Sequence, residues 1–124
     1  YAKADFKLYQ KKNNDTLQSF LALLEKHKGE SIEAGTLLKV GEIYEQRKEY
    51  TKALTYYQNI LENHKDGIYI DEALFYSAEI YRKFLLENEK AKAFYEKMVL
   101  EHPDSLYYTE SRKQYRTLRG DSAI

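Results

Sequence analysis

Three histidines are the side chains of this sequence with the most obvious capacity for chemistry, and they recur at a nearly fixed interval. His27, His64 and His102 lie 37 and 38 residues apart, each near the end of a segment with a helical pattern. Imidazole nitrogens bind zinc, but a zinc site needs its donors within about 2 Å of one ion. Equivalent positions in stacked helical units lie on the order of 10 Å apart. We therefore predict no metal site, and we interpret each histidine as a residue that interacts with the carbonyl groups and dipole at its helix end.

The carboxylates are numerous but do not form a catalytic pattern. Pairs such as Glu42/Glu45 and Glu87/Glu89 have the spacing of solvated helix faces. General acid–base catalysis instead needs carboxylates that converge in a pocket with shifted pKa values. The sequence contains no cysteine, no glycine-rich phosphate loop, no H-E-x-x-H and no G-x-S-x-G. We predict that the protein is not an enzyme and needs no cofactor.

A row of arginines near the end of the sequence has two interpretations. Arg112, Arg116 and Arg119 fall at i, i+4 and i+7, so they share one face of a helix. The opposite stripe consists of Tyr108, Ser111, Tyr115 and Leu118. The interpretation that we favour is a capping helix whose basic end suits its own dipole and which Gly120 ends. The alternative, a basic docking face for an acidic partner or a preceding domain, stays open.

The composition describes the elements that must position these side chains. One proline and five glycines among 124 residues leave few interruptions, and thirteen tyrosines occur without a tryptophan. Abundant Leu, Glu, Lys, Ala and Gln favour helix almost throughout, and tyrosines suit shallow contacts between helices. Twenty basic residues balance 20 acidic ones, so we predict no nucleic-acid partner. No apolar run approaches the roughly 18 residues of a membrane-spanning helix, so we predict no direct membrane insertion.

An internal repeat organises the chain. "ALTYYQNILENHKD" at Ala53–Asp66 returns as "AKAFYEKMVLEHPD" at Ala91–Asp104, and a fainter copy starts at Thr16. "GEIY" at Gly41–Tyr44 likewise returns as "AEIY" at Ala78–Tyr81. A period of about 30–40 residues indicates a solenoid of helical hairpins.

The repeat predicts a single all-α domain. We expect helices over residues 1–12, 15–28, 32–47, 50–64, 69–86, 88–101 and 105–119. The repeat units span residues 1–33, 34–70 and 71–105, and a capping helix spans 106–119. The offset between copies rises from 37 to 38 after Tyr81, which predicts one extra residue in that turn. In the first unit we expect a shorter turn around Asn13–Asp15. Because the chain starts at Tyr1, we expect it to be a piece of a longer protein.

The repeated residues resemble the pattern of the tetratricopeptide repeat (TPR) family. In the second unit its positions hold Leu37, Val40, Gly41, Tyr44, Ala53, Tyr57, Ile60 and Lys65. In the third they hold Leu74, Ser77, Ala78, Tyr81, Ala91, Tyr95, Met98 and Pro103. The match is strong over 34–105, weak over 1–33 and partial over 106–119. It implies a right-handed α-solenoid of about three hairpins plus a C-terminal capping helix.

The pattern also has a physical reading. Gly41 and Ala53 are small where the two helices of a hairpin approach most closely, and Ala78 and Ala91 repeat that arrangement. We expect four tyrosines to fill the space toward the next hairpin: Tyr44, Tyr57, Tyr81 and Tyr95. The joints at 67–73 and 105–111 resemble those of TPR proteins from the bacterial cell envelope, which favours a periplasmic or envelope location.

The resemblance implies a protein–protein interaction module that displays a concave groove for a peptide or helix of a partner. In such a stack the first helix of each hairpin lines that face. The predicted partner-binding residues are Leu38, Glu42, Glu45, Phe75, Tyr76, Glu79 and Arg82. We expect Leu38, Phe75 and Tyr76 to be apolar anchors, because repeat packing does not demand apolar groups there. Glu42 would repel a C-terminal carboxylate, which argues against one class of TPR ligand.

Two other functions remain open at this point. The chain could be a structural or self-associating spacer of a larger bacterial envelope protein, in which case copies would form a homo-oligomer. A sugar-binding groove would instead need tyrosine rings exposed side by side.

Overall fold

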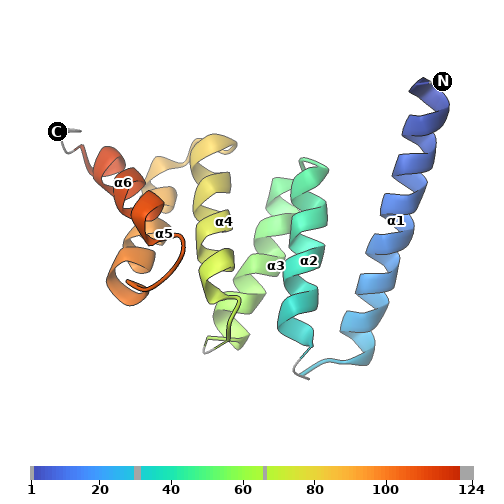
Figure 1. Cartoon of the computed structure of the whole chain (residues 1–124), viewed down its shortest axis with the longest axis horizontal. Helices are drawn as coiled ribbons and strands as arrows, with labels where there is room; N and C mark the ends of the chain where they lie inside the picture. The colour runs from blue at the N-terminus through green and yellow to red at the C-terminus, as the bar shows by residue number, and fades with distance from the viewer. Residues whose placement is uncertain (1, 30–31, 66, 121–124) are drawn as a thin grey trace.

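The computed structural model describes residues 2–29, 32–65 and 67–120, with backbone alone for 2–10 and 13. Six α-helices and no strand occur in these ranges. The helices are α1 (Ala2–Lys26), α2 (Glu33–Gln46), α3 (Tyr50–Asn63), α4 (Ile70–Lys83), α5 (Asn88–Glu101) and α6 (Tyr108–Arg119). They form a row in chain order, in which each helix packs mainly against its neighbours in sequence (Figure 1). The predicted all-α, TPR-like solenoid is confirmed.

The hairpin α2–α3 closes where the sequence predicts its closest approach. Tyr57 and Ala53 are buried completely, and a Cβ added to Gly41 would lie 2.5 Å from the Tyr57 ring. Glycine is therefore required because the aromatic ring occupies the space that any side chain would need. The turn that joins the two helices places Lys48 in the left-handed region, with φ of 64°.

The hairpin α4–α5 repeats this packing with small differences. Ala78, Ala91 and Tyr95 are buried completely and form one cluster. Four residues separate α4 from α5, whereas three separate α2 from α3, so the predicted extra residue is confirmed. Leu86 in this turn has φ of 55° and lies 38 residues after Lys48. The two turns thus share a left-handed residue at equivalent places.

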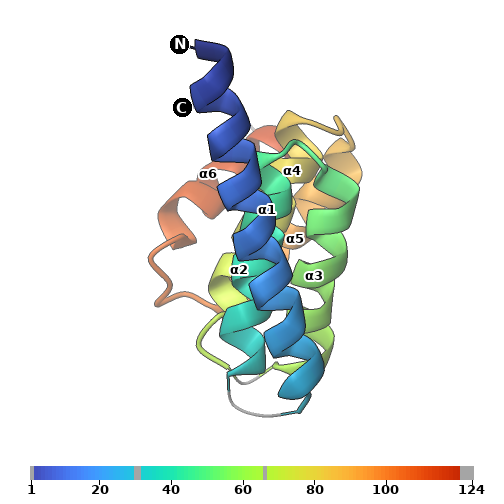
Figure 2. The ribbon, with the colours of Figure 1, turned by 90° about the vertical axis from the view of Figure 1, so that its right-hand side faces the viewer.

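The predicted turn around Asn13–Asp15 is wrong, because α1 runs through it as one helix of 25 residues. The first unit is therefore a single helix, and the described chain has two hairpins flanked by α1 and α6 rather than three hairpins and a cap. The N-terminal end of α1 extends past the turn between α2 and α3 (Figures 1 and 2).

Local side chains explain why α1 does not break. The segment contains no glycine or proline, and Thr16 Oγ1 donates to the carbonyl of Lys12 at 2.9 Å, within the helix. The Asn14 side chain, which we read as a turn former, accepts a hydrogen bond from the Arg47 guanidinium instead. Leu17 is buried against Val40 and Ile43, so tertiary contacts with α2 favour the straight helix over the turn.

The tyrosines behave in two ways. Tyr57 reaches the next hairpin as predicted, with its ring 5.7 Å from that of Tyr76. Tyr44 stacks instead on Tyr56 at 5.6 Å. In the other hairpin Tyr81 stacks on Phe94 at 5.5 Å. The expectation that Tyr44 and Tyr81 fill the space toward the next hairpin is wrong, because both stack within their own hairpin.

The last helix has the predicted form of a cap. α6 ends at Gly120, whose φ of 91° is left-handed and whose N–H bonds the carbonyls of Arg116 and Thr117. Ser111 is fully buried, and Tyr115 and Leu118 pack onto the α4–α5 cluster. The helix begins three residues later than predicted, because the joint after His102 continues to Tyr107.

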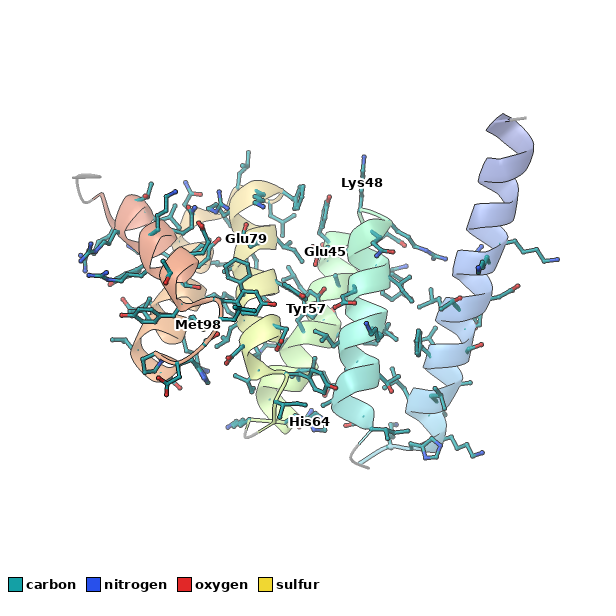
Figure 3. The ribbon with its side chains drawn as sticks, in the orientation of Figure 1. Glu45, Lys48, Tyr57, His64, Glu79 and Met98 are labelled. Atoms are coloured by element: carbon teal, nitrogen blue, oxygen red, sulfur yellow. The ribbon has the colours of Figure 1, made fainter. Side chains whose placement is uncertain are left out.

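Each hairpin is held at its open end by a histidine. His64 Nε2 lies 2.7 Å from Glu33 Oε1, and His102 Nδ1 lies 3.2 Å from Asp71 Oδ1. Both carboxylates occupy the first turn of the hairpin's first helix. Figure 3 places His64 at the edge of the row opposite Lys48 and its turn. Each histidine therefore bonds a carboxylate of the preceding helix in addition to the predicted interaction with its own helix end.

The described residues contain no group of three or more histidine and carboxylate side chains that could hold a metal ion. None of their helices is long and apolar enough to cross a lipid bilayer.

Candidate protein-binding face

Three of the predicted binding residues, Glu42, Glu45 and Tyr76, line a hollow between α2 and α4. The hollow has a volume of about 280 Å³ and is lined by Glu42, Glu45, Gln46 and Tyr76. A second hollow of about 430 Å³ between α1 and α2 also includes Glu42 and Gln46 in its lining. Glu42 and Gln46 of α2 therefore lie between the two hollows. We call the polar residues on this side the α2–α4 face; they are Glu42, Glu45, Gln46, Tyr76, Glu79 and Arg82.

Leu38 is not on this face. Its side chain is only 6% exposed and belongs to the largest core cluster. The expectation of an exposed apolar anchor is wrong at this position, because α2 buries two successive leucines, Leu37 and Leu38, against α3 and α4.

Phe75 and Tyr76 are held by packing that the sequence analysis did not foresee. The Phe75 ring stacks on Tyr107 at 4.6 Å, and Tyr76 meets Tyr107 edge-on at 6.3 Å. Phe75 also lies edge-on to Tyr95 at 6.3 Å. Tyr107 belongs to the joint between α5 and α6, so this joint folds back over α4. The matching joint carries Tyr69 at the same place in the sequence, a signal that could have predicted the contact.

Glu45 is held in place by a hydrogen bond from Tyr57. The Tyr57 hydroxyl donates a hydrogen bond of 2.8 Å to Glu45 Oε1, and Figure 3 shows both side chains beside α2. Partial burial raises the pKa of the Glu45 carboxyl, and the nearby carboxylates of Glu42 and Glu79 raise it further. The Tyr57 hydrogen bond and the charge of Lys83 act in the opposite direction. The carboxylate is thus held in place but poorly solvated.

In the hairpin α4–α5, the tyrosine hydroxyl and the carboxylate have a different set of partners. Arg82 Nη2 donates to Glu79 Oε2 at 2.7 Å, and its Nε donates to the Tyr95 hydroxyl at 3.0 Å. The Tyr95 hydroxyl in turn donates to Glu79 Oε1 at 3.0 Å. Lys83 adds an ion pair to Glu79 at 3.0 Å. The Glu79 carboxylate, the Arg82 guanidinium and the Tyr95 phenol therefore each bond the other two.

Comparison with known protein families agrees with this repeated geometry. Residues 36–67 and 72–105, more than half of the chain, match the tetratricopeptide repeat family. The chain belongs to the TPR family. No curated protein matches it closely enough to count as a relative. TPR repeats generally mediate protein–protein interaction and scaffolding, and TPR domains are typically not catalytic.

The two matched TPR units correspond to the two hairpins. The first match covers α3 and all but the first three residues of α2, and the second covers α5 and all but the first two residues of α4. Helix α1 lies outside both matches, in agreement with its failure to form a hairpin. The α2–α4 face is therefore made by the first helices of two consecutive TPR units.

The predicted basic face is separate from the α2–α4 face. Arg112 and Arg116 are exposed on α6. The Arg119 guanidinium lies over the Tyr115 ring at 4.9 Å. The inward stripe of α6 is confirmed by the buried Ser111.

The other side of the TPR units carries a hollow that sequence reasoning missed. It has a volume of about 620 Å³ and lies between α3 and α5, over Ser77 and Tyr81 of α4. Its α3 wall consists largely of uncharged polar residues, among them Thr51, Thr55 and Asn59. The spacing Thr51, Thr55, Asn59 along α3 would have predicted a shared polar face, but the depth of the hollow depends on how far α5 lies from α3.

Proposed function

We propose that this TPR chain binds a protein partner through the α2–α4 face. The observation that carries the proposal is the pair of hollows on either side of α2, about 280 and 430 Å³, which share Glu42 and Gln46 in their linings. The proposal assigns no catalytic role to the face. It takes the partner to be a peptide segment or a helix, which the hollows on either side of α2 are large enough to contact.

The lining is preorganised, which favours binding. Tyr76 is fixed by edge contacts to Tyr57 and Tyr107, and Glu45 is fixed by the Tyr57 hydroxyl. A partner that binds such a face does not have to immobilise these side chains. The free energy lost in ordering the receptor is therefore small.

A selection experiment tests this proposal. Random peptides displayed on phage are selected on the whole chain, and their affinities are measured by fluorescence anisotropy. Gln46→Trp places a bulky ring between the two hollows and should weaken the selected peptides by about tenfold or more. The matched control is Gln18→Trp, on an exposed position of α1. It should change affinity by less than about twofold.

Two results would contradict the proposal. Selected peptides that bind Gln46→Trp as well as the parent chain would place the binding site elsewhere. An absence of selected peptides, together with light scattering that shows dimers or larger species at rising concentration, would favour the self-associating spacer instead.

A further inference from the structure

We propose that the hollow between α2 and α4 receives an arginine side chain of the partner protein, bound by Glu42 and Glu45 against the ring of Tyr76. This inference rests on the proposed function and specifies the chemistry of the partner, which is a segment with an exposed arginine. The reason is that the other hairpin of the chain has the same arrangement with an arginine of its own in place; we call this the filled version.

The filled version is in the hairpin α4–α5. The repeat makes Glu79 the equivalent of Glu42 and Arg82 the equivalent of Glu45, both 37 residues apart. Arg82 bonds Glu79 at 2.7 Å and the Tyr95 hydroxyl at 3.0 Å. A guanidinium thus satisfies the carboxylate and the phenol of this hairpin together.

The hairpin α2–α3 has the same carboxylate and phenol without the guanidinium. Glu45 stands where Arg82 stands in the other unit, and it accepts a hydrogen bond of 2.8 Å from Tyr57. Glu42 pairs with Lys39 at 3.6 Å, a lysine whose side chain is 61% exposed. Glu45 forms no ion pair within the described part of the chain. Two carboxylates therefore line the hollow and are only weakly compensated.

The neighbouring cations of α4 are already engaged. Arg82 is committed to Glu79 and Tyr95, and Lys83 pairs with Glu79 at 3.0 Å. Neither can serve Glu45 without breaking these contacts. Lys83 lowers the pKa of Glu45 through its charge alone, so an arginine of a partner could still bond both carboxylates directly.

A guanidinium suits the hollow better than an ammonium. Its planar fork can donate to two carboxylates at once, and it stacks on aromatic faces such as that of Tyr76. An ammonium offers the charge without the planar fork. A carboxylate of a partner would be repelled, in line with the argument from Glu42 in the sequence.

Titration with defined peptides tests the partner's chemistry. The whole chain, labelled with ¹⁵N, is titrated with a capped alanine-based peptide that carries one central arginine. Matched peptides carry lysine or citrulline, the uncharged isostere of arginine, at that position. The arginine peptide should shift the amide signals of Glu42, Glu45 and Tyr76. The lysine peptide should bind several-fold more weakly than the arginine peptide. The citrulline peptide should bind at least about tenfold more weakly than the arginine peptide.

Substitutions at Glu45 provide the second arm. Glu45→Arg copies the other hairpin, so it should raise the melting temperature and abolish the response to the arginine peptide. Glu45→Gln removes the charge without filling the hollow, and it should weaken the arginine peptide about tenfold. Equal binding of the arginine and citrulline peptides, or an unchanged response of Glu45→Arg, would overturn the inference.

The failure of this inference is distinguishable from the failure of the proposed function. Peptides that bind the face regardless of charge would leave the proposed function standing and remove the arginine. If light scattering shows that the chain self-associates and that Arg112→Ala or Arg116→Ala abolishes this, the guanidinium comes from a second copy, and the inference of a separate partner is wrong.

Discussion

The two hairpins share one scaffold and differ in how they satisfy a buried tyrosine. In α4–α5 the Tyr95 hydroxyl bonds both Arg82 and Glu79. In α2–α3 the Tyr57 hydroxyl bonds only Glu45 among the residues that the structure describes. The hairpin α4–α5 contains the cation that its carboxylate needs, whereas α2–α3 presents two carboxylates beside a hollow.

The difference separates the residues that build a repeat from those that vary on it. A small residue at Gly41 or Ala78 and a ring at Tyr57 or Tyr95 are fixed by the distance between two helices. Glu45 and Arg82 occupy equivalent repeat positions with opposite charges, although both hairpins keep the same small residue and buried ring. A repeat protein can thus give one unit a ligand that the next unit does not take.

The largest expected effects come from two equivalent side chains that the sequence offered as partner contacts. Leu38→Ala empties a core position and should lower the free energy of unfolding by about 2–5 kcal/mol. Phe75→Ala removes ring contacts with Tyr95 and Tyr107, and since Phe75 is half-buried, it should cost about 2–4 kcal/mol. Urea unfolding followed by circular dichroism measures both. The exposed Gln46→Ala serves as a control and should stay within about 0.5 kcal/mol; equal stability of Leu38→Ala and this control would contradict the burial of Leu38.

A reciprocal exchange tests whether the two hairpins differ in their closest approach. Gly41→Ala puts a Cβ 2.5 Å from the Tyr57 ring and should destabilise the chain by about 1–3 kcal/mol. Ala78→Gly relieves no such contact and should cost about 1 kcal/mol through helix propensity. Thermal and urea unfolding give the two values. A stabilised Gly41→Ala would show that the ring of Tyr57 can move away.

Removal of each hydroxyl sharpens the comparison of the polar sets. Tyr57→Phe leaves the half-buried Glu45 without its donor and should cost about 1–3 kcal/mol near neutral pH. Tyr95→Phe leaves Arg82 and Glu79 still bonded to each other at 2.7 Å, so about 0.5–1.5 kcal/mol is expected. Chemical unfolding measures both losses. A larger loss for Tyr95→Phe than for Tyr57→Phe would mean that the contact between Arg82 and Glu79 depends on the Tyr95 hydroxyl.

The smallest effect is a divergence in pH dependence between two carboxylates of α2. Burial raises the pKa of Glu45 in the folded state. The free energy of unfolding of the parent chain therefore falls as pH rises from the unfolded-state pKa of Glu45 through its raised folded-state pKa. A hydrogen bond from the Gly29 amide, and then His64, lower the pKa of Glu33, so its contribution is present at higher pH and is lost as pH falls through the folded pKa. Relative to the parent chain, Glu45→Gln should therefore gain stability and Glu33→Gln should lose it between about pH 3 and pH 7. Parallel curves for the two variants, recorded by thermal unfolding, would contradict the assignment.

The sequence predicted most of the fold, because the repeat marks each helix twice. Helix α5 was placed at residues 88–101 as observed, and the longer turn after Tyr81 followed from a change in offset. The first unit failed, because Asn13, Asn14 and Asp15 favour a turn locally but also fit a helix whose other face packs on α2. Local propensity was overridden by contacts with Val40 and Ile43.

The candidate face was predicted only in part. Glu42, Glu45 and Tyr76 do line one hollow, and Glu79 and Arg82 do lie together. Leu38 was assigned to the same surface because helical periodicity fixes the direction of a side chain only to within a fraction of a turn. A rotation of that size about the helix axis moves a side chain from an exposed to a buried position.

The sequence by itself determined the repeat, the order of the helices and the small residues that face each tyrosine, since these depend on spacing along one or two adjacent helices. Only the tertiary structure decided that Tyr107 covers Phe75, that His64 meets Glu33 across 31 residues, and that two carboxylates border a hollow between α2 and α4. Such contacts depend on the rotation and separation of helices that are far apart in the chain. Those quantities result from the packing of all side chains together, and no single segment encodes them.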